Sequence, residues 1–153
     1  MKKVLLFMLV AFLTQATMAQ DVKKVKDLLA ANKLPEAKTM IDQMIANPKN
    51  SKSAEVWYVK GKTYSAIAMS PTERGANPEA RMTSLEAFKK SQELDKNAFT
   101  LYVTADGYMP IFNLYTSGFE AGANLYNTEK YDDALATFKN TGTVGEYIFT
   151  QGW

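Results

Sequence analysis

Apolar residues recur at intervals of three and four along most of the chain after residue 20. Val22, Val25 and Leu28 start the pattern. The same spacing returns in residues 37–45, 57–67, 82–94 and 110–127, and once more from residue 131 onward. This period places apolar side chains on one face of an α-helix, and clusters of Asn, Pro, Ser and Gly between the stretches indicate helix ends. We therefore predict an all-α fold without paired strands.

One segment departs from this pattern. Residues 99–110, FTLYVTADGYMP, contain β-branched residues and an Asp-Gly turn signal. Such a composition favours extended backbone. Within an otherwise helical chain, a short extended piece is therefore left open for this segment as an alternative to helix.

The N-terminus has the layout of a secretory signal peptide. Two lysines precede an apolar run of ten residues, 4–13, and the small residues Thr17 and Ala19 follow it. Ten helical residues extend roughly 15 Å, about half of a ~30 Å hydrocarbon core, so a membrane span is not expected. We predict a signal peptide over residues 1–19 and an exported domain over residues 20–153, without an integral membrane segment once the signal is removed.

The sequence contains no cysteine and no histidine. The absence of both residue types excludes thiol nucleophiles, the histidine-based catalytic pairs and the usual zinc ligand sets. Without Lys2 and Lys3, the 18 basic residues become 16, against 16 acidic residues. A near-neutral chain lacks the basic footprint of a nucleic-acid-binding protein. We expect no metal, no cofactor and no nucleic-acid partner.

The stretch WYVKGKTY, residues 57–64, resembles the first helix of a tetratricopeptide repeat. Trp57, Gly61 and Tyr64 stand at the family's intervals, whereas Lys60 occupies the position of its usual leucine. The second helix of this copy resumes after an insertion, at Ser84, Phe88 and Ser91.

Two further stretches are similar to the same repeat. One has Gly122 and Leu125 in its first helix and Gly118 where the family has tryptophan. Its second helix carries Tyr131, Ala134 and Phe138. A weaker copy at the N-terminus consists of Val25, Leu28, Leu34, Ala37 and Ile41.

The resemblance implies a short right-handed α-solenoid of about three helix hairpins. A small residue at a helix crossing lets two backbones approach, and aromatic residues fill the space beside it. The expected packing positions are Trp57, Gly61, Tyr64, Phe88, Gly122, Leu125, Tyr131, Ala134 and Phe138.

The resemblance also implies a concave groove for an extended peptide or a partner helix. Outward positions of each first helix would line it. These positions are Tyr58, Lys62, Ser65, Phe119, Ala123, Tyr126 and Asn127, with Lys26 and Leu29 added by the N-terminal copy.

Asp132 and Asp133 raise the question of acid catalysis. They fall in the first turn of an expected helix, where carboxylates favour the positive end of the helix dipole. Tyr131, Ala134 and Phe138 are expected to face the core, so both acids should point to solvent. We interpret the pair as a helix start with no catalytic role.

The resemblance implies a non-enzymatic, exported scaffold that holds a protein partner in a bacterial periplasm or at the outer membrane. Two alternatives stay open. One is a glycan-binding helical surface protein that uses exposed aromatic residues. The other is a carboxylate-only hydrolase with Glu120, Glu129, Asp132 or Asp133, which needs two acids facing each other across roughly 5–10 Å.

The C-terminal stretch TGTVGEYIFTQGW, residues 141–153, is apolar and carries no charged cap. Tyr147, Ile148, Phe149 and Trp153 supply its apolar side chains. Solenoids normally close with a polar-faced terminal element. We therefore expect either that this chain is the front part of a longer array or that its apolar end docks on a partner or a second copy.

Overall fold

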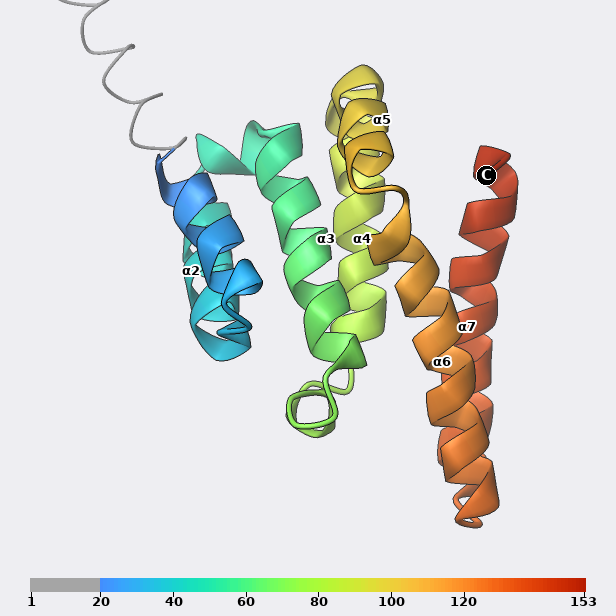
Figure 1. Ribbon diagram of the computed structural model, residues 1–153. Coiled ribbons are helices and arrows are strands. Elements are labelled where there is room, and N and C mark those ends of the chain that lie inside the picture. The colour runs from blue at the N-terminus through green and yellow to red at the C-terminus, as the bar shows by residue number, and fades with distance from the viewer. Residues whose placement is uncertain (1–19) are drawn as a thin grey trace, which may run out of the picture.

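The computed structural model describes residues 20–153, and these residues form helices joined by turns, with no strand among them. The all-α prediction is confirmed for this part of the chain. In Figure 1 the helices stand side by side, from α2 at one end of the molecule to α7 at the other. The predicted signal peptide lies outside the described residues.

The N-terminal part consists of a helix over residues 20–30, α2 (Leu34–Ala46) and α3 (Ala54–Met69). A proline in the first turn of α2 fits there because that turn needs no backbone N–H. Ser53 caps α3 by accepting a hydrogen bond from the Val56 N–H at 3.4 Å. The apolar faces of the three helices merge in one core cluster of Val22, Val25, Ala37, Ile41, Met44, Val56 and Val59.

Helix α3 packs closely against α4 (Ala80–Leu94). A Cβ atom added to Gly61 would lie 2.5 Å from the Phe88 ring, so only glycine allows this crossing. The hydroxyl of Ser84 donates to the Gly61 carbonyl at 2.7 Å, and that of Ser91 donates to the Ala54 carbonyl at 2.7 Å. Two residues that resemble the repeat thus also tie the helices together by hydrogen bonds.

Of the alternatives left open for residues 99–110, the extended piece is not formed. Most of this segment forms helix α5 (Lys96–Ala105), which Asp95 caps by accepting from the Ala98 N–H at 3.0 Å. Phe99 and Val103 on α5 are fully buried, and this burial outweighs the weak β preference of the segment. The Asp-Gly signal marks the turn between two helices, where Gly107 and Tyr108 adopt φ values of 59° and 61°.

Helices α6 (Met109–Asn127) and α7 (Tyr131–Gln151) form a second close hairpin. Gly122 faces Phe138 as Gly61 faces Phe88, again with 2.5 Å from an added Cβ to the ring. Gly118 lies against Thr141, where a tryptophan side chain would have no room.

The C-terminal apolar residues fold onto the chain's own core. Tyr147 and Ile148 are buried, and the Trp153 ring lies 5.2 Å from that of Tyr108 and 6.2 Å from that of Phe99, centroid to centroid. Phe149 alone of this group is exposed, at 84 %. Tyr147, Ile148 and Trp153 therefore contribute to this chain's own core, and Phe149 is the member of the group that is left for a contact with a partner or a second copy.

The other residues expected at packing positions differ in their burial and contacts. Tyr64 and Ala134 are buried, Leu125 is half-buried, and Trp57 donates from Nε1 to the Ser51 carbonyl at 2.8 Å. Tyr131 is 56 % exposed, so the prediction that it faces the core is wrong. Its ring packs on the exposed Tyr126 instead, at 5.3 Å between centroids.

Candidate partner-binding groove

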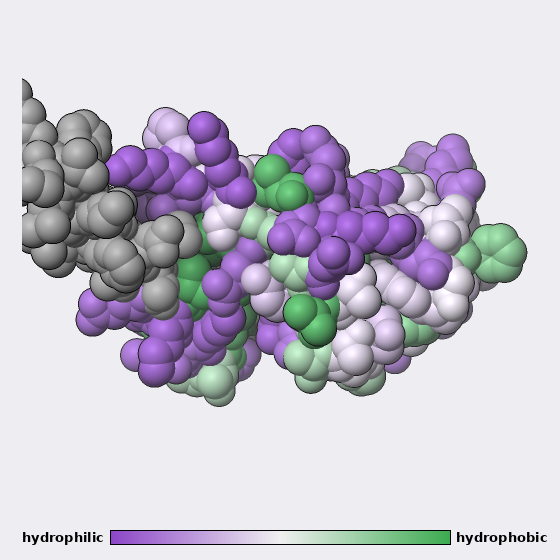
Figure 2. All heavy atoms as spheres, turned by 90° about the horizontal axis from the view of Figure 1, so that it is seen from above, coloured by the Kyte–Doolittle hydropathy of each residue, from purple (hydrophilic) through white to green (hydrophobic). Residues whose placement is uncertain are grey.

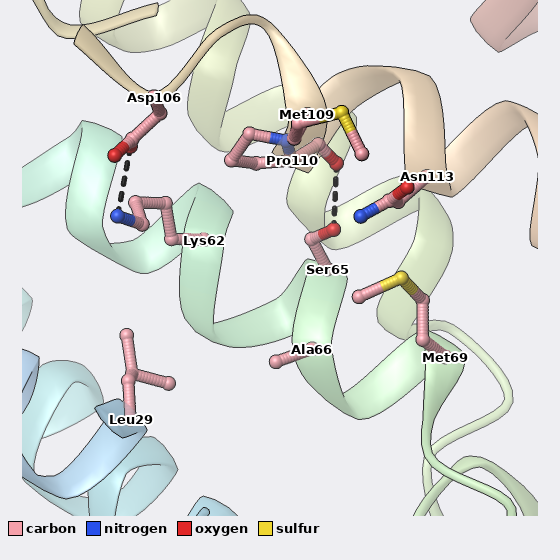
Figure 3. Close-up of a pocket in the computed structure, with 9 residues that line it drawn as sticks. All are labelled: Leu29, Lys62, Ser65, Ala66, Met69, Asp106, Met109, Pro110 and Asn113. Atoms are coloured by element: carbon pink, nitrogen blue, oxygen red, sulfur yellow. Dashed lines mark hydrogen bonds and ion pairs between the residues drawn. The ribbon is translucent and has the colours of Figure 1, made fainter.

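An open groove of about 270 Å³ lies between the helix over residues 20–30, α3 and the start of α6. Figure 3 shows side chains from all three helices directed toward this space. The lining residues are Leu29, Lys62, Ser65, Ala66, Met69, Asp106, Met109, Pro110 and Asn113. Most of these side chains are apolar, and the charged pair stands at one end.

Asp106 closes that end of the groove through two strong contacts. Lys62 Nζ lies 2.7 Å from its Oδ2, and the Tyr58 hydroxyl donates to the same oxygen at 2.7 Å. Partial burial acts to raise the pKa of Asp106, but the hydrogen bonds from Lys62 and Tyr58, with the charge of Lys62, outweigh it and lower the pKa below 3.8. At neutral pH the carboxylate is therefore ionised and bound by Lys62 and Tyr58.

Tyr58 anchors the turn between α5 and α6 onto α3. Its hydroxyl also lies 3.1 Å from the Tyr102 carbonyl oxygen. Burial, and then the contact with Asp106, raise the pKa of Tyr58 well above its ordinary value of 10.0. The tyrosine stays protonated and serves as a hydrogen-bond donor.

A second tyrosine–lysine pair of α3 holds α2 in the same manner. The Tyr64 hydroxyl donates to Asp42 Oδ2 at 2.6 Å, and Lys60 Nζ lies 3.1 Å from Oδ1. Lys60 also stands over the rings of Trp57 and Tyr64. This explains why a lysine occupies the position where the family has leucine: it contacts an acid of the preceding helix.

The structure brings together part of the predicted groove. Lys62, Ser65 and Leu29 line it, although Ser65 is buried and its hydroxyl donates to the Pro110 carbonyl at 2.6 Å. Lys26 forms an ion pair with Glu55 at 2.6 Å and lies outside the groove lining.

The prediction that Tyr58 lines the groove is wrong, because only 3 % of this residue is exposed and α5 covers it. The predicted α6 residues do not line the groove either. Phe119, Ala123, Tyr126 and Asn127 are exposed farther along α6.

Sequence reasoning missed six lining residues, which are Ala66, Met69, Asp106, Met109, Pro110 and Asn113. Four of them belong to the turn before α6 or to its first turns. A sequence signal existed in the Asp-Gly pair and the proline that follows it. The same signal is also typical of a turn beside an extended piece, so it does not by itself indicate a groove.

The candidate acids of the hydrolase alternative all lie away from the groove. Glu120, Glu129, Asp132 and Asp133 are exposed, and the last two stand in the first turn of α7 as predicted. Among residues 20–153, no cluster of three or more potential ligands could hold a metal ion. Within the same range, no helix has the length and apolar character needed to cross a membrane.

Comparison of the chain with protein-family models, with curated proteins and with solved structures finds no match.

Proposed function

We propose that this chain is an exported, non-enzymatic scaffold whose helix hairpins stack as a short right-handed solenoid similar to tetratricopeptide repeats. It holds a protein partner in the bacterial periplasm or at the outer membrane. The groove between the first helices of successive hairpins is the partner-binding surface. The observation that carries the proposal is the convergence of these three helices on one open, mainly apolar groove.

The groove suits an extended segment with apolar side chains. Leu29, Ala66 and Met69 offer an apolar floor, and methionine adapts its shape to different side chains. The Asn113 amide, which points into the same space in Figure 3, can donate and accept hydrogen bonds with a peptide backbone. Lys62 is already paired with Asp106, so the groove does not depend on an acidic partner.

Repeated packing supports the solenoid part of the proposal. The pairs Gly61–Phe88 and Gly122–Phe138 have the same geometry in two hairpins. Hairpins that each leave an apolar stripe uncovered gain stability by stacking on the next one.

The test is a peptide-library selection on the purified exported protein, followed by calorimetry with the selected peptides. Ala66→Glu places a charge in the groove, and Gln43→Glu places the same charge on an exposed position of α2 outside it. We expect Ala66→Glu to weaken peptide binding at least about tenfold, because a charge in an apolar contact costs more than ~1.4 kcal/mol. Gln43→Glu should bind as the unmodified chain does.

Equal binding by both variants, with circular dichroism showing both folded, would contradict the groove as the binding surface. Selection of no peptide at all would contradict it as well.

A further inference from the structure

Helix α6 presents an apolar stripe to solvent, away from the groove. Phe112, Phe119 and Tyr126 are exposed along it, with Thr116 and Ala123 between them. The intervals alternate between four and three residues, as in the seam of a coiled coil. Met109, at the rim of the groove, extends the stripe by one step.

Helix α7 carries a second stripe with the same intervals. Its members are Tyr131, Leu135, Phe138, Gly142, Gly145 and Phe149. The two stripes touch, because the ring centroids of Phe119 and Phe138 lie 6.0 Å apart and those of Tyr126 and Tyr131 lie 5.3 Å apart. Together they form one surface, which we call the hairpin face.

The hairpin face is nearly free of charge. Glu120 is the one charged residue among the 19 residues of α6. The charged residues of α7 fall outside its stripe; they are Asp132, Asp133, Lys139 and Glu146. In the view of Figure 2, hydrophilic residues gather mainly over the N-terminal half, whereas the α7 end is largely of intermediate hydropathy, with one apolar group projecting from it. A contiguous apolar surface of this length marks an interaction site.

The sizes along the α6 stripe are complementary to a second, antiparallel copy of the same stripe. A two-fold axis between Thr116 and Phe119 places these two residues opposite each other across the interface. The same axis places Phe112 opposite Ala123. Each phenylalanine ring then meets a smaller side chain, which is how facing layers interdigitate.

The α7 stripe obeys the same symmetry. A two-fold axis at the level of residue 140 brings the exposed Tyr131 to the level of the exposed Phe149 of the second copy, and the exposed Leu135 to the level of Gly145. Gly118, beside the midpoint of the α6 stripe, lies against Thr141, beside the midpoint of the α7 stripe. One two-fold axis therefore serves both helices.

Gly142 supplies an independent observation. It lies inside α7, is exposed, and has no atom within 4 Å of the place where a Cβ would stand. Glycine weakens a helix interior, and no contact within the described chain compensates for it. This open space lies on the hairpin face, where a side chain of a second copy can enter.

Charge is also compatible with this pairing. The axis that matches the α6 stripes places Glu120 at the level of residue 115 of the second copy, away from Glu120 of that copy. No carboxylate of the face meets its own copy. No two like charges therefore face each other across the proposed interface, so electrostatic repulsion does not oppose the pairing.

We propose that two copies of this chain associate through the hairpin face, so that α6 and α7 of each copy form an antiparallel four-helix bundle. Such a contact is isologous and closes after two chains. The stripes are roughly 26 Å long and two helices wide, the extent of a standard interface of about 800 Å² per partner. The groove opens on another side of α6, with Met109 at the shared rim.

The experiment compares the exported protein with two single variants by sedimentation equilibrium over a range of concentrations. Ala123→Glu places a charge within the α6 stripe, and Asn124→Glu places the same charge on the next residue, which is exposed but outside the stripe. We expect the unmodified chain and Asn124→Glu to form dimers. Ala123→Glu should dimerise at least about tenfold more weakly, because its charge would be buried against Phe112 of the second copy.

The orientation is tested by cross-linking, which is clean because the chain has no cysteine. Chains carrying Phe112→Cys are mixed with chains carrying Ala123→Cys and oxidised. We expect a disulfide between the two kinds of chain, and little between Phe112→Cys and Asn124→Cys.

A monomer at every concentration would overturn the proposal. A dimer that Ala123→Glu leaves unchanged, or disulfides formed between two Ala123→Cys chains, would also overturn it.

Discussion

Gly61 and Gly122 show what single residues contribute to this fold. Each sits where one helix crosses its hairpin partner, and in each case an added Cβ would lie 2.5 Å from a phenylalanine ring. Phe88, the ring beside Gly61, is fully buried and has no room to withdraw.

Gly61→Ala should therefore lower the free energy of unfolding by about 1–3 kcal/mol, the usual result of overpacking. Chemical denaturation measures the change. Gly75→Ala is the control, because nothing lies within 4 Å of a Cβ at that position. Similar stabilities for the two variants would contradict the close crossing of α3 and α4.

Asp106 provides a pH-dependent contribution to stability. Its pKa is lower in the folded chain than its ordinary value of 3.8, so the ionised form stabilises the fold. This contribution is fully present above pH 3.8 and is lost as the pH falls through the lower folded pKa.

Asp106→Asn should lower the free energy of unfolding at neutral pH by about 1 kcal/mol, a modest value because partial exposure screens the charges. The difference from the unmodified chain should shrink below pH 3.8 and vanish at lower pH. Urea denaturation at several pH values measures it, with Glu86→Gln, an exposed residue of α4, as the control. A difference that stays constant with pH would show that Lys62 and Tyr58 do not act through the charge of Asp106.

At the scale of elements, Arg81 joins two helices that the sequence places far apart. It lies on α4, is buried, and donates to the Leu114 carbonyl and, at 3.1 Å, to the Ser117 hydroxyl on α6. Burial, and then the charge of Arg74, lower the pKa of Arg81. The guanidinium is thus satisfied mainly by neutral oxygens of α6.

Arg81→Met keeps an unbranched apolar stem but removes these hydrogen bonds. We expect a loss of about 2 kcal/mol in the free energy of unfolding, as for hydrogen bonds from charged groups. Amide hydrogen exchange should rise most around residues 109–118, where α6 loses its contact with α4. Arg74→Met, an exposed change in the preceding turn, should leave both measurements unchanged within error.

The elements themselves were predictable where local pattern and packing agree. Pro35 fits the first turn of α2, Ser53 caps α3, and the resemblance to the repeat placed Gly61 and Phe88 on two helices of one hairpin. Helix α5 was not predicted because its stability comes from distant partners: Phe99 and Val103 are buried, and Tyr58 reaches from α3 to the Tyr102 carbonyl. The resemblance to the repeat family placed Tyr58 on the outward side of α3, because the family pattern contains no helix equivalent to α5 that would cover it.

At the scale of the whole molecule, export is the first expectation to check. The layout of residues 1–19 predicts cleavage after Ala19, so the intact mass of the exported protein should correspond to residues 20–153. Ala19→Arg should leave the precursor uncut, whereas Gln15→Arg, outside the two small-residue positions, should still be cut. Processing of both variants alike would contradict this cleavage site.

The molecule then presents two surfaces for which we propose different roles. The groove between the helix over residues 20–30, α3 and α6 is open and small, and suits a segment of another protein. The hairpin face is longer and almost uncharged, and we propose that it pairs with a second copy. A dimer built on that face would carry two grooves, and a partner with two binding segments would gain avidity from both.

The central claim is that the groove holds a protein partner, and photo-crosslinking in the cells that make this protein tests it most directly. A photoreactive amino acid is placed at Met69 in the groove, and separately at Gln43 on the exposed surface of α2. We predict one discrete protein adduct at Met69, lost when Ala66→Glu is added and absent at Gln43. No adduct at Met69, or the same adducts at both positions, would contradict the claim.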